Sequence, residues 1–305
     1  REHGGRHHAR YQTKAGSPVK KLWLLYQDAD FAVNGDFAVS MHAHGLPYGL
    51  DIEPVCLSQL TLGMSEAGLP FCLRNGRPAK PDGVLSRQRN PLVSRHFEQL
   101  GVPVYNNSRV CALCNDKRVT CQFLAGLPMP QTVFLQSGQP DPPAGTAFPA
   151  VIKPACSHGG DRVTLVCSQE QWLDATAVIF PSPAVQQRVV SGAGRDLRVY
   201  VVDGRIYAGV LRTAQNGGIV SNFKRGGRAE LHPLTEEEAS LAKQAIQRFE
   251  NAGAHLWLAG VDLLYQDDRP VLGEVEDVVG SRMLYQVSEL DIIDAFLCRL
   301  SARME

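Results

Sequence analysis

A tight turn in the last third of the chain, at Asp203-Gly204, constrains the fold more than any other feature of the sequence. An Asp-Gly pair between two apolar runs favours a two-residue turn with positive φ at both residues, which is the turn of a β-hairpin. The apolar runs at residues 197–202 and 206–211 flank this pair. The sequence therefore predicts a hairpin across these residues.

A capped helix and a second pair of strands follow the hairpin. Residues 235–238 read Thr-Glu-Glu-Glu, a capping box in which the first and last side chains each bond the other residue's backbone N–H. Apolar residues then recur on one helical face, and Gly253 ends the pattern. Beyond it we predict strands at residues 255–264 and 271–276, joined by a turn at 266–270.

The first third of the chain alternates short apolar runs with amphipathic segments. This alternation indicates a small α/β domain with a parallel sheet. The predicted strands are residues 21–26, 82–86 and 102–105, and the predicted helices are residues 34–44 and 91–100.

The middle of the chain is less regular. Its sequence predicts a helix over residues 110–124 and a strand at 131–135, followed by a Gly- and Pro-rich connector. A further strand at 148–153 leads into the polar, glycine-rich segment 157–162.

The charge balance argues against a polyanionic partner. Lys plus Arg equal Asp plus Glu at 31 each, so no global field favours nucleic acid or an acidic membrane surface. The sequence has no apolar run of about 18 residues, the length that a membrane-spanning helix needs. Residues 1–21 are basic and rich in Gly and His, and we expect a flexible tail, linker or tag there.

The eight cysteines are scattered and do not show the spacing of a disulfide framework. This usage favours a reduced, cytoplasmic setting. Cys111 and Cys114 form a C-x-x-C pair, but without a second pair at zinc-ribbon spacing buried structural thiols are the favoured interpretation over a metal or redox role.

Three carboxylates form the most informative constellation. Glu274 and Glu276 share one face of a predicted strand, and Asp262 lies roughly opposite Glu274 if the two strands pair through the turn near Asp267. Like charges so placed raise one another's pKa unless cations neutralise them. Hard oxygen ligands suit Mg²⁺. The alternative is an edge strand whose polar face meets solvent, but the apolar neighbours favour a cleft.

Basic residues provide the counterpart to these acids. Lys153 ends an apolar strand just before the glycine-rich segment, whose backbone N–H groups could contact phosphate. The segment is neither a Walker A loop nor a dinucleotide fingerprint, and an ordinary turn is its commoner interpretation. Arg198, Arg212 and Arg225 could bind phosphate or carboxylate bidentately, although each alone is also compatible with a surface charge.

The order of these segments resembles the ATP-grasp superfamily, and most closely the RimK-like carboxylate–amine ligases, over about residues 107–297. The segments that carry the resemblance are NSRVCALCNDK, GLPMPQT, FPAVIKP, SHGGDRV, GRDLRVYVVDGRIYAG, SNFKRGG, AGVDLL and GEVE. The resemblance implies an α/β fold, α+β in the ATP-grasp part, with ATP between two subdomains. The implied domains are a tail at 1–21, a pre-ATP-grasp α/β domain at 22–105, a central small subdomain at 106–186, and a C-terminal subdomain with the metal site at 187–305.

The resemblance also implies a role for individual residues. It makes Lys117 and Lys153 ligands of the ATP phosphates, covered by a mobile loop. It makes the segment at Gln187 a hinge that holds adenine through main-chain groups. The full implied set is Lys117, Lys153, Ser157, His158, Gly159, Gly160, Gln187, Arg188, Val189, Asp196, Ser221 and Asn222 for ATP, Asp262, Glu274 and Glu276 for metal, and Arg212 and Arg225 for the reacting phosphate and carboxylate.

Two departures from the family pattern limit this transfer. The third metal position is usually Asn and is Glu276 here, which leaves the number of metal ions open. The family then commonly reads Ser-Ser-Pro-Gly, whereas this chain has residues 277–280 reading Asp-Val-Val-Gly, so a glutamate substrate is not carried over. Arg282 is a candidate carboxylate ligand, although a surface arginine at a helix start is the favoured interpretation. Asn34 and Arg87 are candidates from the N-terminal domain.

The expected activity is amide or peptide bond formation with ATP and Mg²⁺, or Mn²⁺, through an acylphosphate. The substrates would be a small-molecule or peptide carboxylate and an amine such as an amino acid, with no nucleic acid or membrane partner. Homo-oligomerisation stays open. The alternatives are a kinase of the same fold and a non-catalytic nucleotide-binding module.

Overall fold

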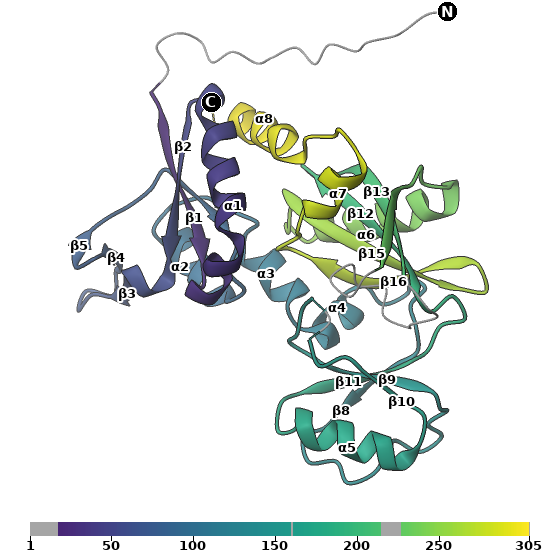
Figure 1. The fold of residues 1–305 in the computed structure, drawn as a ribbon. Helices are drawn as coiled ribbons and strands as arrows, with labels where there is room; N and C mark the ends of the chain where they lie inside the picture. Colours follow the sequence, from purple (N-terminus) through teal and green to yellow (C-terminus); the bar gives the residue numbers. More distant parts are fainter. Residues whose placement is uncertain (1–17, 160, 215–226, 305) are drawn as a thin grey trace, which may run out of the picture.

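The computed structural model describes residues 18–159, 161–214 and 227–304 of the chain. These residues form four sheets flanked by helices (Figure 1). No helix within them is both long and apolar enough to cross a membrane.

The N-terminal sheet is parallel, as its alternating sequence predicts. Its strand order is β2-β1-β6-β7, and every neighbouring pair runs in parallel. The strands are β1 (Lys20–Tyr26), β2 (Leu50–Cys56), β6 (Gly83–Ser86) and β7 (Val104–Tyr105), with helices α1 (Asp28–Gly45) and α2 (Pro91–Gln99). Strand β2 was not predicted.

Helix α1 begins before the predicted start at residue 34. Asn34 has non-helical backbone angles, φ −119° and ψ 20°, and marks a kink inside the helix. Asn and Gly are weak helix formers, so Asn34-Gly35 favours a helix boundary in the sequence. In the structure the helix continues across this pair.

A small antiparallel sheet follows β2, and the sequence did not reveal it. Its strands are β3 (Leu60–Met64), β4 (Pro70–Arg74) and β5 (Arg77–Pro78), preceded by the short 3₁₀ turns Leu46–Tyr48 and Leu57–Gln59. These strands are short and half-exposed, so their hydrophobic alternation is weak.

The predicted helix over residues 110–124 is wrong, because the structure has two helices there. They are α3 (Ser108–Cys114) and α4 (Lys117–Phe123). Asn115 leaves the helix to donate from its side chain to Asp277, and Asp116 caps α4 by accepting from the N–H of Arg118 at 2.9 Å. Asn and Asp bond local backbone in this way, which favours caps over helix interiors.

The middle of the chain forms a separate four-stranded sheet of order β10-β9-β11-β8. Its strands are β8 (Thr132–Leu135), β9 (Ala150–Pro154), β10 (Thr164–Val166) and β11 (Ala184–Arg188). Helix α5 (Gln169–Ile179) packs on this sheet and buries Trp172 completely (Figure 1). The predicted strands at 131–135 and 148–153 are confirmed with shifted starts.

The C-terminal sheet is antiparallel, with order β14-β13-β12-β15-β16. It comprises β12 (Arg195–Val202), β13 (Arg205–Thr213), β14 (Arg228–Leu231), β15 (Leu258–Gln266) and β16 (Arg269–Glu276). The hairpin is confirmed: Asp203 and Gly204 have φ of 50° and 67° between β12 and β13. The turn between β15 and β16 also contains two residues with positive φ, Asp267 and Asp268.

Helix α6 (Glu236–Asn251) covers one face of the C-terminal sheet. Its capping box is confirmed, since Glu238 accepts from the Thr235 N–H at 2.8 Å and donates its own N–H to Thr235 at 3.3 Å. Leu241, Ala245 and Phe249 pack into a core with the valines of β12 and β15. The opposite face packs at one end against the N-terminal sheet and the C-terminal helix, through Tyr200, Val202 and Leu258, which leaves its other end for a site.

The end of the chain returns to the N-terminal sheet. Helix α7 (Arg282–Val287) is followed by α8 (Ile292–Met304), which lies beside α1 in Figure 1. Phe296 and Leu300 of α8 share a buried core with Leu24 and Met41. This packing fixes the N-terminal sheet against the C-terminal part of the chain.

Candidate active site

A cavity of about 1340 Å³ lies where the three larger sheets meet. Its wall includes the carboxyl end of β1, helices α3 and α4, strands β9 and β11, and part of the C-terminal sheet's face opposite α6. The cavity-lining residues that sequence analysis selected are Asn34, Arg87, Cys114, Lys117, Lys153, Ser157, His158, Gly159, Gln187, Arg188, Val189, Asp196, Arg198, Arg212, Asp262, Glu274, Glu276 and Arg282.

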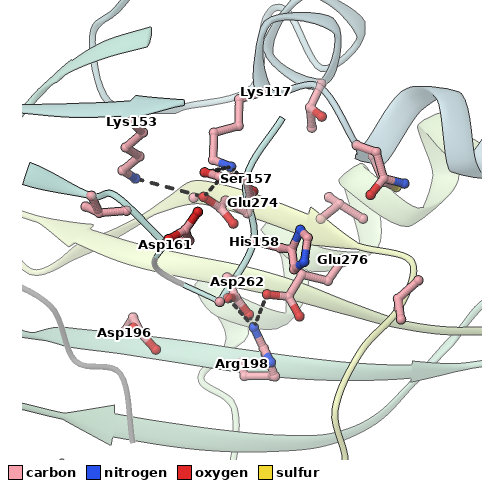
Figure 2. Close-up of a pocket in the computed structure, with 18 of the residues that line it drawn as sticks. Lys117, Lys153, Ser157, His158, Asp161, Asp196, Arg198, Asp262, Glu274 and Glu276 are labelled. Atoms are coloured by element: carbon pink, nitrogen blue, oxygen red, sulfur yellow. Dashed lines mark hydrogen bonds and ion pairs between the residues drawn. The ribbon is translucent and has the colours of Figure 1, made fainter. Parts of the chain in front are cut away.

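Strand pairing gathers six of these charged side chains on one sheet face. Residues directly opposite in antiparallel strands share a face. Arg198 is opposite Asp262, Asp262 is opposite Glu274, and Asp196 is opposite Arg212. Glu276 lies two residues beyond Glu274 and so points the same way, as Figure 2 shows.

A bulge at Gly273 adjusts this arrangement, which simple alternation did not predict. Asp262 pairs with Glu274 but the next residue, Leu263, pairs with Leu272, so Gly273 is the extra residue of β16. A Cβ on Gly273 would lie 3.1 Å from the carbonyl oxygen of Asp262. Glycine at position 273 therefore allows the backbone of β16 to lie close to that of β15 beside Asp262 and Glu274.

Asp262 is held by two arginines. Arg198 donates to both of its oxygens at 2.8 and 2.6 Å, and Arg212 donates to one of them at 2.7 Å. Burial alone would raise the pKa of Asp262, but the charges of Arg198 and Arg212 outweigh it and hold that pKa far below its usual range. Asp262 is therefore ionised at any physiological pH.

The two glutamates have different environments. Burial raises the pKa of Glu276, and the nearby carboxylates of Asp262 and Glu274 add to the rise, while Arg198, at 2.8 Å, opposes it. Glu274 instead faces two ammonium groups, with Lys117 Nζ at 3.6 Å and Lys153 Nζ at 4.0 Å from its Oε1 (Figure 2).

The two lysines reach Glu274 from different elements. Lys117 begins α4, where it also donates to the carbonyl oxygen of Ser157, and Lys153 lies in β9. Burial lowers the pKa of Lys153, and Glu274 opposes that change. Two cations that converge on one carboxylate in a cavity can exchange it for the oxygens of a bound phosphate chain.

The glycine-rich segment connects β9 to β10 and lines the cavity through Ser157, His158 and Gly159. Burial lowers the pKa of His158, and the charge of Arg89 lowers it further. At the opposite end of the same sheet unit, Gln187 and Arg188 close strand β11, and Val189 follows. Gln187 donates from its side chain to Thr132 at 3.0 Å.

Four selected residues, Gly160, Ser221, Asn222 and Arg225, lie outside the described residues. Arg282 begins α7 and is exposed, as expected for a helix start, and it also lines the cavity. Cys111 and Cys114 are adjacent to the site, but burial raises the pKa of both thiols, in keeping with structural cysteines.

Sequence reasoning missed the part that Tyr26, Asn115 and Asp277 play in the cavity wall. Asp277 is buried, burial raises its pKa to about 6, and Asn115 donates to both of its oxygens at 3.1 and 3.0 Å. The only signal for it was its place directly after the acidic strand, where the family pattern is interrupted.

The three carboxylates fit a hard cation by their oxygen chemistry and their common face. Within the described ranges, however, no group of three or more His, Cys, Asp and Glu side chains is arranged so that it could hold a metal ion. The arginines and lysines neutralise the carboxylates instead. Binding of Mg²⁺ at Asp262, Glu274 and Glu276 would therefore require these residues to exchange partners.

A family model for the RimK-like ATP-grasp domain matches residues 122–299. The chain belongs to the RimK-like ATP-grasp family. As a member it is an ATP-grasp ligase, and its fold agrees with that membership. The ATP-grasp ligase PsnB, solved with a variant precursor, Mg and ADP, superimposes with a TM-score of 0.66 at 17% identity over 95% of this chain and 100% of that one.

Two curated relatives support the same family. A probable alpha-L-glutamate ligase 2 of Shewanella frigidimarina is 32% identical over 215 residues, covering 68% of this chain and 70% of that protein. Human beta-citrylglutamate synthase B is 30% identical over 277 residues, covering 83% of this chain and 69% of that protein.

Proposed function

We propose that this RimK-like chain uses ATP to activate a substrate carboxylate and joins it to the amine of an amino acid. One observation carries the proposal: three carboxylates share one face of the C-terminal sheet, and two lysines from α4 and β9 approach one of them inside a cavity that extends to the N-terminal sheet. The carboxylate would attack the γ-phosphorus of ATP and release ADP. The amine would then attack the acylphosphate carbon, lose its proton and release phosphate.

The lysines would hold the phosphates. The ammonium groups of Lys117 and Lys153 both approach the carboxylate of Glu274, which shows where they would bind an anion. A phosphate chain there would receive two charge-assisted contacts, which stabilise charge as it develops on the transferred group. The backbone of Ser157, His158 and Gly159 would close over the same position.

Arg212 would act on the reacting groups while Arg198 serves the framework. Arg198 uses its Nε and one terminal nitrogen on Asp262, and the same terminal nitrogen contacts Glu276, so two carboxylates of the sheet hold it. Arg212 uses its Nε on Asp196 and one terminal nitrogen on Asp262. A guanidinium has five N–H groups, so each arginine keeps a second terminal nitrogen for a ligand, and we assign the reacting groups to Arg212 on the resemblance.

The remaining roles follow the walls of the cavity. Asp196 would accept from the hydroxyls of the nucleotide sugar, and main-chain groups from Gln187 to Val189 would hold the adenine. Asp262, Glu274 and Glu276 would hold Mg²⁺, which when bound would neutralise charge on the phosphates. We place Arg225, Ser221 and Asn222 in the same site on the resemblance alone.

The names of both curated relatives include glutamate. We therefore propose an acidic amino acid as the first amine to test, with polycarboxylic acids as first partners. All eight cysteines are free thiols, which supports a reducing compartment such as the cytoplasm.

The test is ADP and phosphate release by the purified protein with Mg-ATP, with acids and amines supplied singly and in pairs. We expect ADP and free phosphate together only when both substrates are present, along with a product of amide mass. ADP without free phosphate, with a phosphorylated acceptor, would instead identify a kinase. Nucleotide binding without turnover on any pair would contradict the ligase.

A further inference from the structure

A second polar corner of the cavity lies on the N-terminal sheet. Strands β1 and β6 are neighbours, and the chain leaves them in opposite directions, toward β2 on one side and β7 on the other. Ligands of parallel α/β sheets bind outside the carboxyl ends of the strands at such a reversal point. Tyr26 is the last residue of β1, and Arg87 directly follows β6.

Arg87 is a buried cation without a directly paired carboxylate: burial lowers its pKa, and the charge of Asp277 opposes only part of that change. It is 8% exposed and lines the cavity, yet no carboxylate of the described residues lies within ion-pair distance of it. It donates to the carbonyl oxygen of Val279 at 3.0 Å, and its Nε has no hydrogen-bond partner in the described part of the chain. A buried guanidinium left in this state costs stability.

Tyr26 is in the same condition. Its side chain is 1% exposed, and its hydroxyl has no hydrogen-bond partner among the described residues. Burial raises the pKa of Tyr26, and the adjacent charge of Arg87 opposes part of the rise. The Tyr26 hydroxyl and the Arg87 Nε are thus neighbouring donors buried against the cavity, and no carbonyl or carboxylate oxygen of the described residues accepts from either, although almost all buried polar groups in proteins are satisfied.

Two other arginines show that this state is not general. Arg89 also lines the cavity, but it pairs with Asp30 at 3.0 Å. Arg74 stacks over Trp23, as Arg87 does over Phe37, but it forms a two-armed pair with Glu53 at 2.7 and 2.6 Å and is not among the cavity-lining residues. The Nε of Arg74 also has no hydrogen-bond partner among the described residues, so what distinguishes Arg87 is the missing carboxylate.

We propose that Arg87 and Tyr26 bind a substrate carboxylate that is neither the one activated by ATP nor the α-carboxylate of the amino acid, so that one substrate must carry an additional carboxylate. The proposed phosphate and metal contacts are on α4, β9, β15 and β16, whereas these two donors lie at the carboxyl ends of β1 and β6. One bound carboxylate therefore serves recognition and another serves reaction. This inference rests on the proposed ligase function and narrows its substrates to polycarboxylates.

The additional carboxylate could belong to the acid or to the amino acid. The test measures binding of citrate, N-acetyl-L-aspartate and L-glutamate by calorimetry, with and without Mg-ADP. Acetate, N-acetyl-L-alanine and L-2-aminobutyrate are the matched probes that lack the extra carboxylate. The wild type, Arg87→Met, Tyr26→Phe and the control Arg74→Met are compared.

We expect at least one polycarboxylate to bind the wild type and Arg74→Met equally, and its matched probe to bind far more weakly. Arg87→Met should raise that Kd roughly 10- to 100-fold, as expected for lost hydrogen bonds to a charged group. Tyr26→Phe should raise it by a smaller factor. The polycarboxylate whose Kd changes identifies which substrate supplies the group.

Unchanged affinity in Arg87→Met, or no polycarboxylate binding to the wild type, overturns the proposal. A melting temperature of Arg87→Met well below that of Arg74→Met also overturns it, because Arg87 would then serve the fold. Failure of the wild type to bind Mg-ADP, with polycarboxylate binding retained, would count against the proposed ligase and not against this site.

Discussion

The C-terminal sheet and the N-terminal sheet contribute opposite charge environments to the same cavity. On the C-terminal sheet, Asp262 is gripped by Arg198 and Arg212, and Glu276 also pairs with Arg198. On the N-terminal sheet, Arg87 is buried without an acidic partner in the described part of the chain. The charges of the first wall are paired before any ligand binds, while Arg87 of the second wall interacts with the charge of Asp277 but forms no ion pair in the described residues.

This difference separates two tasks. A self-neutralised wall stays folded and keeps its carboxylates ionised, and it can exchange partners when phosphate and cation arrive together. A wall with one unpaired buried cation has a stability cost that an anionic ligand would remove, which favours that ligand over a neutral one. Recognition and reaction would then depend on different walls.

The largest expected effect comes from removing a contact to the phosphates or to the metal ion. Lys153→Ala and Glu274→Ala should each reduce turnover by at least roughly 100-fold, because the contact acts on charge that develops in the transition state. Circular dichroism should show an intact fold, since both side chains lie at the cavity and not in a hydrophobic core. Full activity in either folded variant would sink the proposed site.

Arg198→Met removes the ion pairs of Arg198 with Asp262 and Glu276 on the C-terminal sheet. It should lower the free energy of unfolding by about 3–5 kcal/mol, because these buried carboxylates are then short of a cation. Arg198 is 6% exposed, close to the 8% of Arg87. Arg87→Met should cost far less or stabilise the protein. Urea unfolding of both variants at pH 7 measures the contrast, and equal losses would remove the distinction between the walls.

The smallest expected effect concerns Glu238, a buried carboxylate that has hydrogen-bond partners and lies outside the cavity. It provides a reference for the two cavity walls. Burial would raise the pKa of Glu238, but hydrogen bonds from Tyr265, Thr235 and His232 lower it below its usual value. A lowered carboxyl pKa stabilises the fold above the unfolded-state pKa, and this contribution disappears as pH falls through the folded-state pKa.

Glu238→Gln should therefore destabilise the protein by about 1 kcal/mol at pH 7. The difference from the wild type should shrink below about pH 4, where the unfolded carboxyl is protonated. Thermal unfolding across this pH range provides the measurement. A difference that stays constant with pH would show that Glu238 acts through shape and not charge.

The sequence by itself determined the local elements whose signals are short-range. The Asp203-Gly204 turn, the capping box at Thr235 and the alternating first domain need only neighbouring residues to be specified, and the structure confirms them. The opposition of Asp262 and Glu274 also followed, because one turn sets the register of both strands.

Only the tertiary structure decided how these charges are neutralised. Arg198 and Asp262 are far apart in the chain and meet through strand pairing, and the bulge at Gly273 adjusts their approach. The break between α3 and α4 depends on Asp277, which lies much later in the chain. The unpaired state of Arg87 is a property of its whole surroundings, because burial and missing partners arise only when distant segments pack together.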